Sequence, residues 1–198
     1  MPHSCIVSIC GPSGSGRSTL AKVLVESLGH EASVRIPADY YLVPAPSRAA
    51  FLERPLQYDW EPLEHAARAL PGNTVITPDF DFETFRRIAL VGGRTFIARP
   101  VAIIDALYPA PFADVKVLLT APDAVRRERV RRRDKVWGTQ VAERWEHLNL
   151  SHAQLEAMPE TYHLVLSGDH AAVENARRIV ALVLPICVRE RRDLNESR

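Results

Sequence analysis

The segment 10-CGPSGSGRST-19 is the feature that most restricts how this chain can fold. Gly11, Gly16 and Ser18 have the spacing of loops whose backbone N–H groups surround phosphate oxygens. A short apolar run precedes the segment and a helical pattern follows it, so the helix would direct its positive end at a bound anion. The segment predicts a phosphate-binding turn between a buried strand and a helix; a glycine-rich turn without a ligand is the alternative.

The rest of the chain repeats this alternation of strand and helix. Short runs rich in β-branched residues lie at 6–10, 33–37, 74–77, 101–105, 115–119 and 163–166. Apolar residues spaced by three and four predict helices over 18–28 and 171–184. We therefore expect an α/β protein in which parallel strands are joined by crossover helices.

Two smaller features are expected beside the sheet. Gly92-Gly93 separates two β-rich runs, and this dipeptide favours a tight turn, so we expect a small β-hairpin flap over about 80–99. The second feature is an arginine-rich segment over about 126–140. Both would belong to a single domain over 1–188, followed by a polar, frayed tail over 189–198.

The composition is that of an ordinary globular protein. Apolar residues make up 46% of the chain and charged residues 25%, and the net charge is +1, so no basic surface for nucleic acid is indicated. The three cysteines lack the spacing of metal ligands. No segment has the length of a membrane span or the pattern of a signal peptide. We expect a cytoplasmic protein without nucleic-acid or membrane partners.

Arg17 stands where loops of this kind usually carry lysine. Guanidinium is planar and forked whereas ammonium is compact, so the change keeps the charge but alters its geometry. Phosphate binding should survive this change, whereas phosphoryl transfer could be slower. The sequence holds 22 arginines and three lysines, so a general preference for arginine also explains the residue.

Further motifs follow in a recognisable order. They are 11-GPSGSGRST-19, 37-PADYYL-42, 57-QYDWEPLEH-65, 78-PDFDFETFRR-87, 100-PVAIIDALYP-109 and 124-AVRRERVRRRD-134. Over about residues 4–168 the order resembles the uridine kinase and phosphoribulokinase family of P-loop kinases, which phosphorylate a hydroxyl group of a nucleoside or sugar. The resemblance implies the P-loop NTPase fold, with a parallel sheet of about five strands flanked by helices and an arginine-rich lid over about 126–140. It also implies ATP and Mg²⁺ as cofactors, a small-molecule acceptor and assembly into a homo-oligomer.

The resemblance implies a catalytic role for Asp39 and Arg17. Asp39 would accept the proton of the attacking hydroxyl, although an ungapped match puts Ala38 on the family's aspartate and Asp39 one position later. A turn-capping aspartate is the alternative. The metal would be held by Ser18 and Asp105. The residues expected to bind the nucleotide are Gly11, Ser13, Gly14, Ser15, Gly16, Arg17, Ser18, Thr19, Arg129 and Arg133.

The expected acceptor pocket departs further from the family. Its residues would be Tyr41, Asp59, Phe80, Phe85, Arg87 and Arg126. Glu61 rivals Asp59, and either could simply begin a helix. Phe80 and Phe85 replace the tyrosine and histidine that help to read a pyrimidine in the family, so uridine as the acceptor is in question. Ordinary core packing is the alternative for both phenylalanines.

The arginines of 124–134 have helical spacing. Arg126, Arg129 and Arg133 would share one face of a helix and could neutralise phosphate charge, while a solvated basic face is the alternative. Together the motifs predict a kinase of a nucleoside, sugar or related polyol. The alternatives are a regulatory protein that binds a nucleotide without transferring phosphate, and a kinase of another acceptor such as pantothenate or glycerate.

Overall fold

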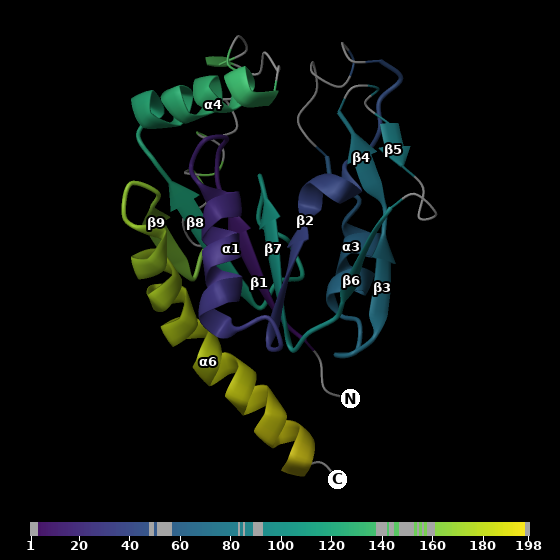
Figure 1. Ribbon diagram of the computed structural model, residues 1–198. Coiled ribbons are helices and arrows are strands. Elements are labelled where there is room, and N and C mark those ends of the chain that lie inside the picture. The colour runs from purple at the N-terminus through teal and green to yellow at the C-terminus, as the bar shows by residue number, and fades with distance from the viewer. Residues whose placement is uncertain are drawn as a thin grey trace.

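A computed structural model describes residues 4–47, 50, 57–82, 84, 86–88, 93–137, 142, 145–146, 153, 155, 157 and 161–196. Five parallel strands form the central sheet in the order β2-β7-β1-β8-β9 (Figure 1). Their bounds are β1 Cys5–Cys10, β2 Ser33–Pro37, β7 Val101–Ala106, β8 Val115–Thr120 and β9 Leu164–Ser167. The predicted α/β class and five-stranded parallel sheet are confirmed.

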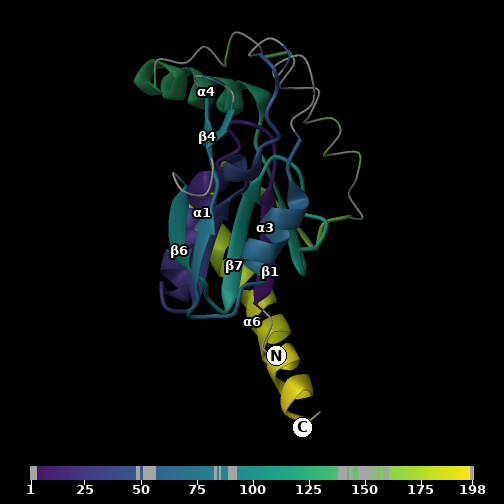
Figure 2. The same ribbon diagram turned by 90° about the vertical axis from the view of Figure 1, so that its right-hand side faces the viewer.

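Helices cover both faces of this sheet. On one face lie α1 (Arg17–Leu28) and α6 (Ala172–Glu196), which pack with Val7, Ile9 and Ile103. On the other face lie the short 3-10 turn η1 (Ala38–Tyr41) and α3 (Trp60–Ala67), as Figure 2 shows from the side. Because β1 and β7 are covered on both faces, all of their residues are buried, which accounts for their continuous apolar sequences.

Two antiparallel strand pairs stand beside the sheet. They are β3 (Thr74–Thr77) with β6 (Arg94–Ile97), and β4 (Asp79–Asp81) with β5 (Arg86–Ile88). The prediction that 74–77 belongs to the parallel sheet is therefore wrong. Its β-branched residues do form a strand, but that strand pairs with 94–97, which had been expected to pair across Gly92-Gly93. Residues 89–92 of that expected turn lie outside the described residues.

Two helices remain, and the second differs from the prediction. Helix α4 (Asp123–Trp137) lies across the carboxyl ends of the strands (Figure 1). Helix α6 continues past Pro185 to Glu196, so most of the tail that was predicted to be frayed is helical. Pro185 removes one helical N–H donor but does not end the helix. Among the described residues, no helix is both long and apolar enough to span a membrane.

Candidate active site

The loop between β1 and α1 needs glycine at the points where it packs most closely. Gly11 and Gly14 have φ angles of +150° and +82°. A Cβ atom on Gly14 would lie 2.5 Å from the carbonyl oxygen of Arg126, and one on Gly11 would overlap that of Leu119. The loop is therefore pressed against β8 and α4, and its path is set by backbone contacts.

Several donors of this loop have no acceptor within the described part of the chain. The backbone N–H groups of Gly14, Gly16, Arg17 and Ser18 donate no hydrogen bond there. The hydroxyl of Ser15 is buried and likewise has no partner. Buried donors are normally satisfied, so a cluster of unsatisfied ones at a helix N-terminus is suited to an anion. The predicted phosphate-binding turn thus has the donors that its function requires.

Arg17 begins α1 and is half-buried. Within the described residues its guanidinium forms no hydrogen bond or ion pair, so its donors are available to a ligand. It lies close enough to Asp39 that its positive charge lowers the pKa of that carboxyl group. The cation of the loop and the predicted base therefore belong to one site.

Arg126 of α4 lies against the phosphate loop. Its side chain is fully buried, donating from Nε to the carbonyl of Ala121 at 3.1 Å and from Nη1 to that of Ser13 at 3.4 Å. It also pairs with Asp123 at 2.9 Å and lies over the ring of Trp145. Its guanidinium is buried in the contact between α4 and the loop, which favours a structural role, and binding of the acceptor by Arg126 stays a prediction.

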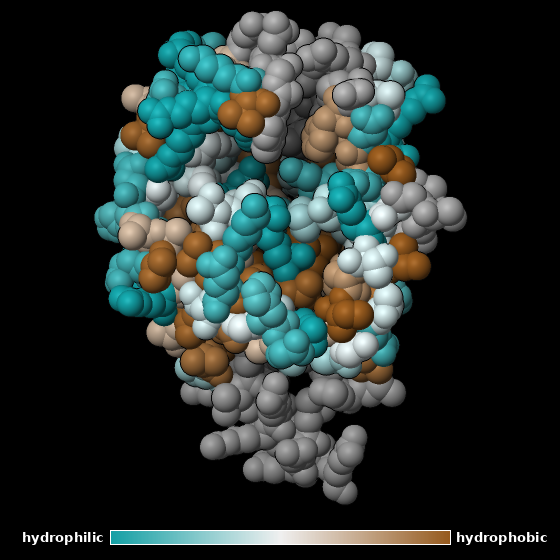
Figure 3. Space-filling view, viewed as in Figure 1, coloured by the Kyte–Doolittle hydropathy of each residue, from teal (hydrophilic) through white to brown (hydrophobic). Residues whose placement is uncertain are grey.

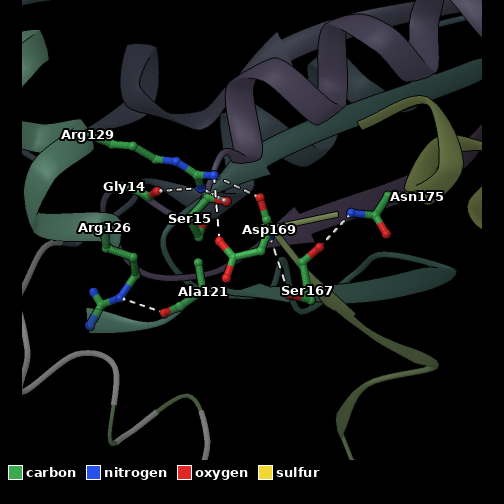
Figure 4. Close-up of polar contacts among 9 residues, drawn as sticks. Gly14, Ser15, Ala121, Arg126, Arg129, Ser167, Asp169 and Asn175 are labelled. Carbon is green, nitrogen blue, oxygen red and sulfur yellow. Dashed lines mark hydrogen bonds and ion pairs between the residues drawn. The ribbon is translucent and has the colours of Figure 1, made fainter. Parts of the chain in front are cut away.

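Arg129 also binds the loop through its backbone, as Figure 4 shows. Its Nη1 atom donates to the carbonyls of Gly14 and Ser15, and Nη2 donates to that of Gly168 at 3.0 Å. It lies 3.7 Å from a carboxylate oxygen of Asp169. Arg129 therefore joins the phosphate loop to the segment after β9, which favours a role in holding the loop.

The segment after β9 was missed by the sequence analysis. A Cβ atom on Gly168 would overlap the carbonyl oxygen of Ser15, so only glycine fits there. Asn175 of α6 fixes the same turn by donating to the carbonyl of Ser167 at 2.8 Å (Figure 4). The signal in the sequence was a glycine directly after a strand, at the edge where parallel sheets collect their ligands.

Asp39 lies in η1, directly after β2. Its side chain is exposed, yet the surrounding protein removes part of its hydration. This desolvation is the main cause that raises the pKa of Asp39. Asp105 raises this pKa further, whereas Arg17, Tyr58 and Arg133 lower it. The Tyr58 hydroxyl is 3.5 Å from Oδ1 of Asp39 and accepts a hydrogen bond from the N–H of Leu107 at 3.0 Å. An accessible carboxyl group with a raised pKa has the properties of a general base.

Arg133 completes this group of charges from α4. Burial lowers its pKa, Asp134 and Asp39 oppose that change, and Arg17 adds to it. Arg126 and Arg129 thus contact the phosphate loop, and Arg133 lies close enough to Arg17 for their charges to interact. Figure 3 shows hydrophilic side chains gathered over α4 and a hollow between α4 and the β4–β5 pair.

The predicted acceptor residues separate into two groups. Arg87 and Asp59 come together in an ion pair of 2.8 Å, and Arg87 also donates to the carbonyls of Tyr41 and Leu42. Tyr41 and Phe80 are 1% and 5% exposed and pack in the core, and their contact with the acceptor stays a prediction. Phe85 lies outside the described residues. The alternative of core packing holds for Phe80.

Asp105, at the end of β7, is held from two sides. Its Oδ2 atom accepts a hydrogen bond of 2.8 Å from the hydroxyl of Ser18. Arg35 of β2 donates to both carboxylate oxygens, from Nε at 3.0 Å and from Nη2 at 2.9 Å. The sequence analysis assigned Ser18 and Asp105 to one metal site without predicting their contact. It missed Arg35, because an arginine inside a strand has no motif of its own.

Comparison with known proteins shows relatives among kinases. No family model matches the chain. Over 93 residues it is 32% identical to the uridine kinase of Halobacterium salinarum, a match that covers 43% of this chain and 41% of that enzyme. The match therefore spans less than half of that relative.

Solved structures extend the similarity to most of the chain. A protein assigned as a fructose transport system kinase from Silicibacter sp. TM1040 covers 83% of this chain, and 90% of its own, with a TM-score of 0.57 and 21% identity. A possible uridine kinase from Bacillus stearothermophilus covers 84% and 90%, with a TM-score of 0.55 and 20% identity. A gluconokinase from Sinorhizobium meliloti 1021 covers 95% of both chains, with a TM-score of 0.56 and 17% identity.

These structures share the fold, while their low identities say nothing of the acceptor. Together with the partial match to a uridine kinase, they confirm the predicted P-loop NTPase fold and the predicted resemblance. This chain has the fold of small-molecule P-loop kinases and resembles a uridine kinase over part of its sequence.

Proposed function

We propose that this chain transfers the γ-phosphate of ATP to a hydroxyl group of a small metabolite, a nucleoside, sugar or related polyol. The observation that carries the proposal is the set of unpartnered donors on residues 14–18 beside an accessible carboxyl group. The amides, the Ser15 hydroxyl and Arg17 would bind phosphate oxygens. Asp39 faces this set closely enough for Arg17 to act on its pKa.

The proposed reaction needs one proton acceptor. Asp39 would take the proton of the acceptor hydroxyl while the hydroxyl oxygen forms a bond to the γ-phosphorus. The bond between that phosphorus and the bridging oxygen to the β-phosphate breaks, and ADP leaves with the electron pair. Arg17 and Arg133 would balance the negative charge on the transferring group.

The side chains present also fit Mg²⁺ bound together with a nucleotide. Ser18 offers an accessible hydroxyl, and Asp105 lies directly behind it. The described residues contain no cluster of three or more acidic, histidine or cysteine side chains that could hold a metal, so phosphate oxygens would complete the ligands. When bound, the ion would neutralise part of the negative charge of the phosphates.

The Asp59–Arg87 pair supports an acceptor that carries hydroxyl groups. Asp59 is 38% exposed, and its carboxylate is held in place by Arg87 at 2.8 Å. A fixed carboxylate accepts hydrogen bonds from sugar or polyol hydroxyls. The pair lies next to η1, which carries Asp39, because Arg87 donates to the carbonyls of Tyr41 and Leu42.

An acceptor panel tests the proposal directly. Purified protein with ATP and MgCl₂ should release ADP only when the correct nucleoside, sugar, polyol or vitamin is added, and pantothenate and glycerate belong in the panel. Asp39→Asn should lower turnover by about 10²–10⁴-fold, the usual contribution of a general base, while ATP binding persists. Glu31→Gln, which removes a carboxylate that is 89% exposed and away from the site, should leave turnover unchanged.

The second candidate function is nucleotide binding without transfer, which the arginine at position 17 favours. It predicts that ATP raises the melting temperature while no acceptor in the panel causes ADP release. Normal turnover by Asp39→Asn would overturn the role of Asp39 as the base. Absence of any ATP or ADP binding would overturn both candidate functions.

A further inference from the structure

The carboxylate expected to face the metal already has a cation of its own. Arg35 holds Asp105 with two parallel hydrogen bonds of 3.0 and 2.9 Å, one to each oxygen. Asp105 is 7% exposed and Arg35 is 25% exposed, so water screens this pair less than it screens a surface ion pair. The third contact of the carboxylate is the Ser18 hydroxyl at 2.8 Å.

The sheet itself sets up this contact. In the register of β2 and β7, Pro37 lies opposite Asp105. Arg35 is two residues before Pro37, so it lies on the same face of β2, the face covered by α1. Its long side chain can therefore reach the carboxylate along that face. Because the partners stand on neighbouring strands of the central sheet, their positions are fixed before any ligand binds.

The pair changes the charge next to the phosphate site. A bare Asp105 carboxylate would repel the phosphates of a nucleotide, and Mg²⁺ would relieve that repulsion. With Arg35 bound, the carboxylate is already balanced, so the repulsion is smaller and the gain from the ion is smaller as well. Arg17, whose donors have no other partner within the described residues, adds a second positive charge at the same loop.

We infer that Arg35 is a positioning residue that acts as the resident counter-ion of Asp105 and makes nucleotide binding at the phosphate loop less dependent on Mg²⁺. The inference rests on the proposed function, because it takes residues 11–19 as the nucleotide site. It assigns a role to a residue outside every motif of the loop. Its measurable quantity is the ratio of ADP affinities with and without Mg²⁺, which reports the coupling between the two ligands.

The experiment is calorimetric titration of ADP in MgCl₂ and in EDTA, without any acceptor or turnover. Wild-type protein should bind ADP under both conditions. In Arg35→Met the ratio of the two affinities should rise roughly tenfold, the usual size of a coupling between sites, mainly because binding in EDTA weakens. Arg99→Gln is the matched control. Arg99 has the same 25% exposure and also pairs with an acidic residue, Glu31, but it precedes β7, whereas Asp105 lies near the carboxyl end of that strand.

Two further variants keep the inference testable. Arg35→Lys keeps the charge, so its ratio should stay near that of the wild type. Asp105→Asn leaves Arg35 as an unbalanced cation, so ADP should bind more tightly than to the wild type in EDTA. This last measurement decides the question if Arg35→Met does not fold.

The outcomes separate the inference from the proposed function. An unchanged ratio in folded Arg35→Met, or unchanged affinity in EDTA for Asp105→Asn, overturns the inference while the nucleotide site stands. A wild-type protein that binds ADP only with Mg²⁺ overturns it as well. A wild-type protein that binds no ADP under either condition overturns the proposed function instead.

Discussion

The phosphate side and the acceptor side of the candidate site are built differently. On the phosphate side, glycines at positions 11, 14 and 168 allow backbone contacts too close for any other residue. Arg126, which is fully buried, locks that loop to α4. On the acceptor side, Asp39 is open to solvent, and its nearest described hydrogen-bonding partner, Tyr58, is 3.5 Å away.

The difference continues in the elements that carry the residues. The phosphate loop follows a central strand of the five-stranded sheet, whereas Arg87 comes from β5, a strand of three residues in a two-stranded pair. Phe82, directly after β4, is 53% exposed. A phosphate side built from close backbone contacts, beside an acceptor side built from side chains on a short strand pair, would let one fold serve different acceptors, because fold and specificity are set by separate parts.

The largest effect on stability is expected when a glycine on the phosphate side is replaced by alanine, which adds one methyl group. Gly14→Ala should lower the free energy of unfolding by about 2–5 kcal/mol, since it combines backbone strain with a clash against Arg126. ADP binding should be lost in calorimetric titration. Gly72→Ala is the control, because Gly72 has a similar φ of +94° but open space around it, and strain alone costs about 1–3 kcal/mol. Equal losses in the two variants would show that the loop tolerates the contact.

The same contrast explains what the sequence could predict. Glycine spacing, the strand before it and the helix after it follow local rules, so the phosphate loop and the five parallel strands could be predicted. The pairing of 74–77 with 94–97 joins two segments that are far apart in the sequence, and neither β-rich segment specifies its partner strand. The roles of Tyr41 and Phe80 depended on burial, which a motif does not specify.

Arginines show this limit most clearly. Arg126, Arg129 and Arg133 share a helical face, and their spacing predicted as much. Which of them is buried against carbonyl groups depends on how closely α4 packs on the loop, and this was not predictable from the spacing. Arg35 belongs to no motif, so its pairing with Asp105 could emerge only from the register of β2 and β7.

A second prediction tests the electrostatic link between the two sides. Arg17→Met should raise the pKa of Asp39 further, because the positive charge of Arg17 lowers it in the wild type. Arg133→Met should act in the same direction but less strongly. Nuclear magnetic resonance titration of the aspartate side-chain carbons measures both shifts without any acceptor. The ADP affinity of Arg17→Met should fall about tenfold to a hundredfold, the size of a hydrogen bond to a charged group.

This link also fixes the expected pH dependence of turnover. Asp39 must be ionised to accept a proton, so activity should fall as the pH drops below its pKa. Since that pKa is raised, the acidic limb should lie above the value of about 3.9 that is usual for aspartate. The limb should move to still higher pH in Arg17→Met. A limb that stays in place when the charge of Arg17 is removed would separate Asp39 from the phosphate side.

The smallest expected effect concerns stability on the acceptor side. The pKa of Asp39 is higher in the folded protein than in the unfolded chain, mainly because of the protein around it. The contribution of this group to stability is therefore fully present below the unfolded pKa and is lost as the pH rises through the folded pKa. Above its folded pKa the carboxylate is ionised in a place that disfavours its charge, so Asp39→Asn should raise the melting temperature in that pH range. The increase should be small, roughly 1–3 °C, because solvent reaches the side chain and screens it.

Thermal unfolding of wild-type protein and Asp39→Asn across a pH series measures this effect. The difference between them should be present above the folded pKa of Asp39 and should vanish at acidic pH, where the wild-type carboxyl group is protonated. Such a gain, in a variant that loses turnover, would mean that the acceptor side holds its base at a cost in stability. If Asp39→Asn is instead less stable at neutral pH, attraction from Arg17 and Arg133 outweighs burial, and Asp39 helps to hold the two sides together.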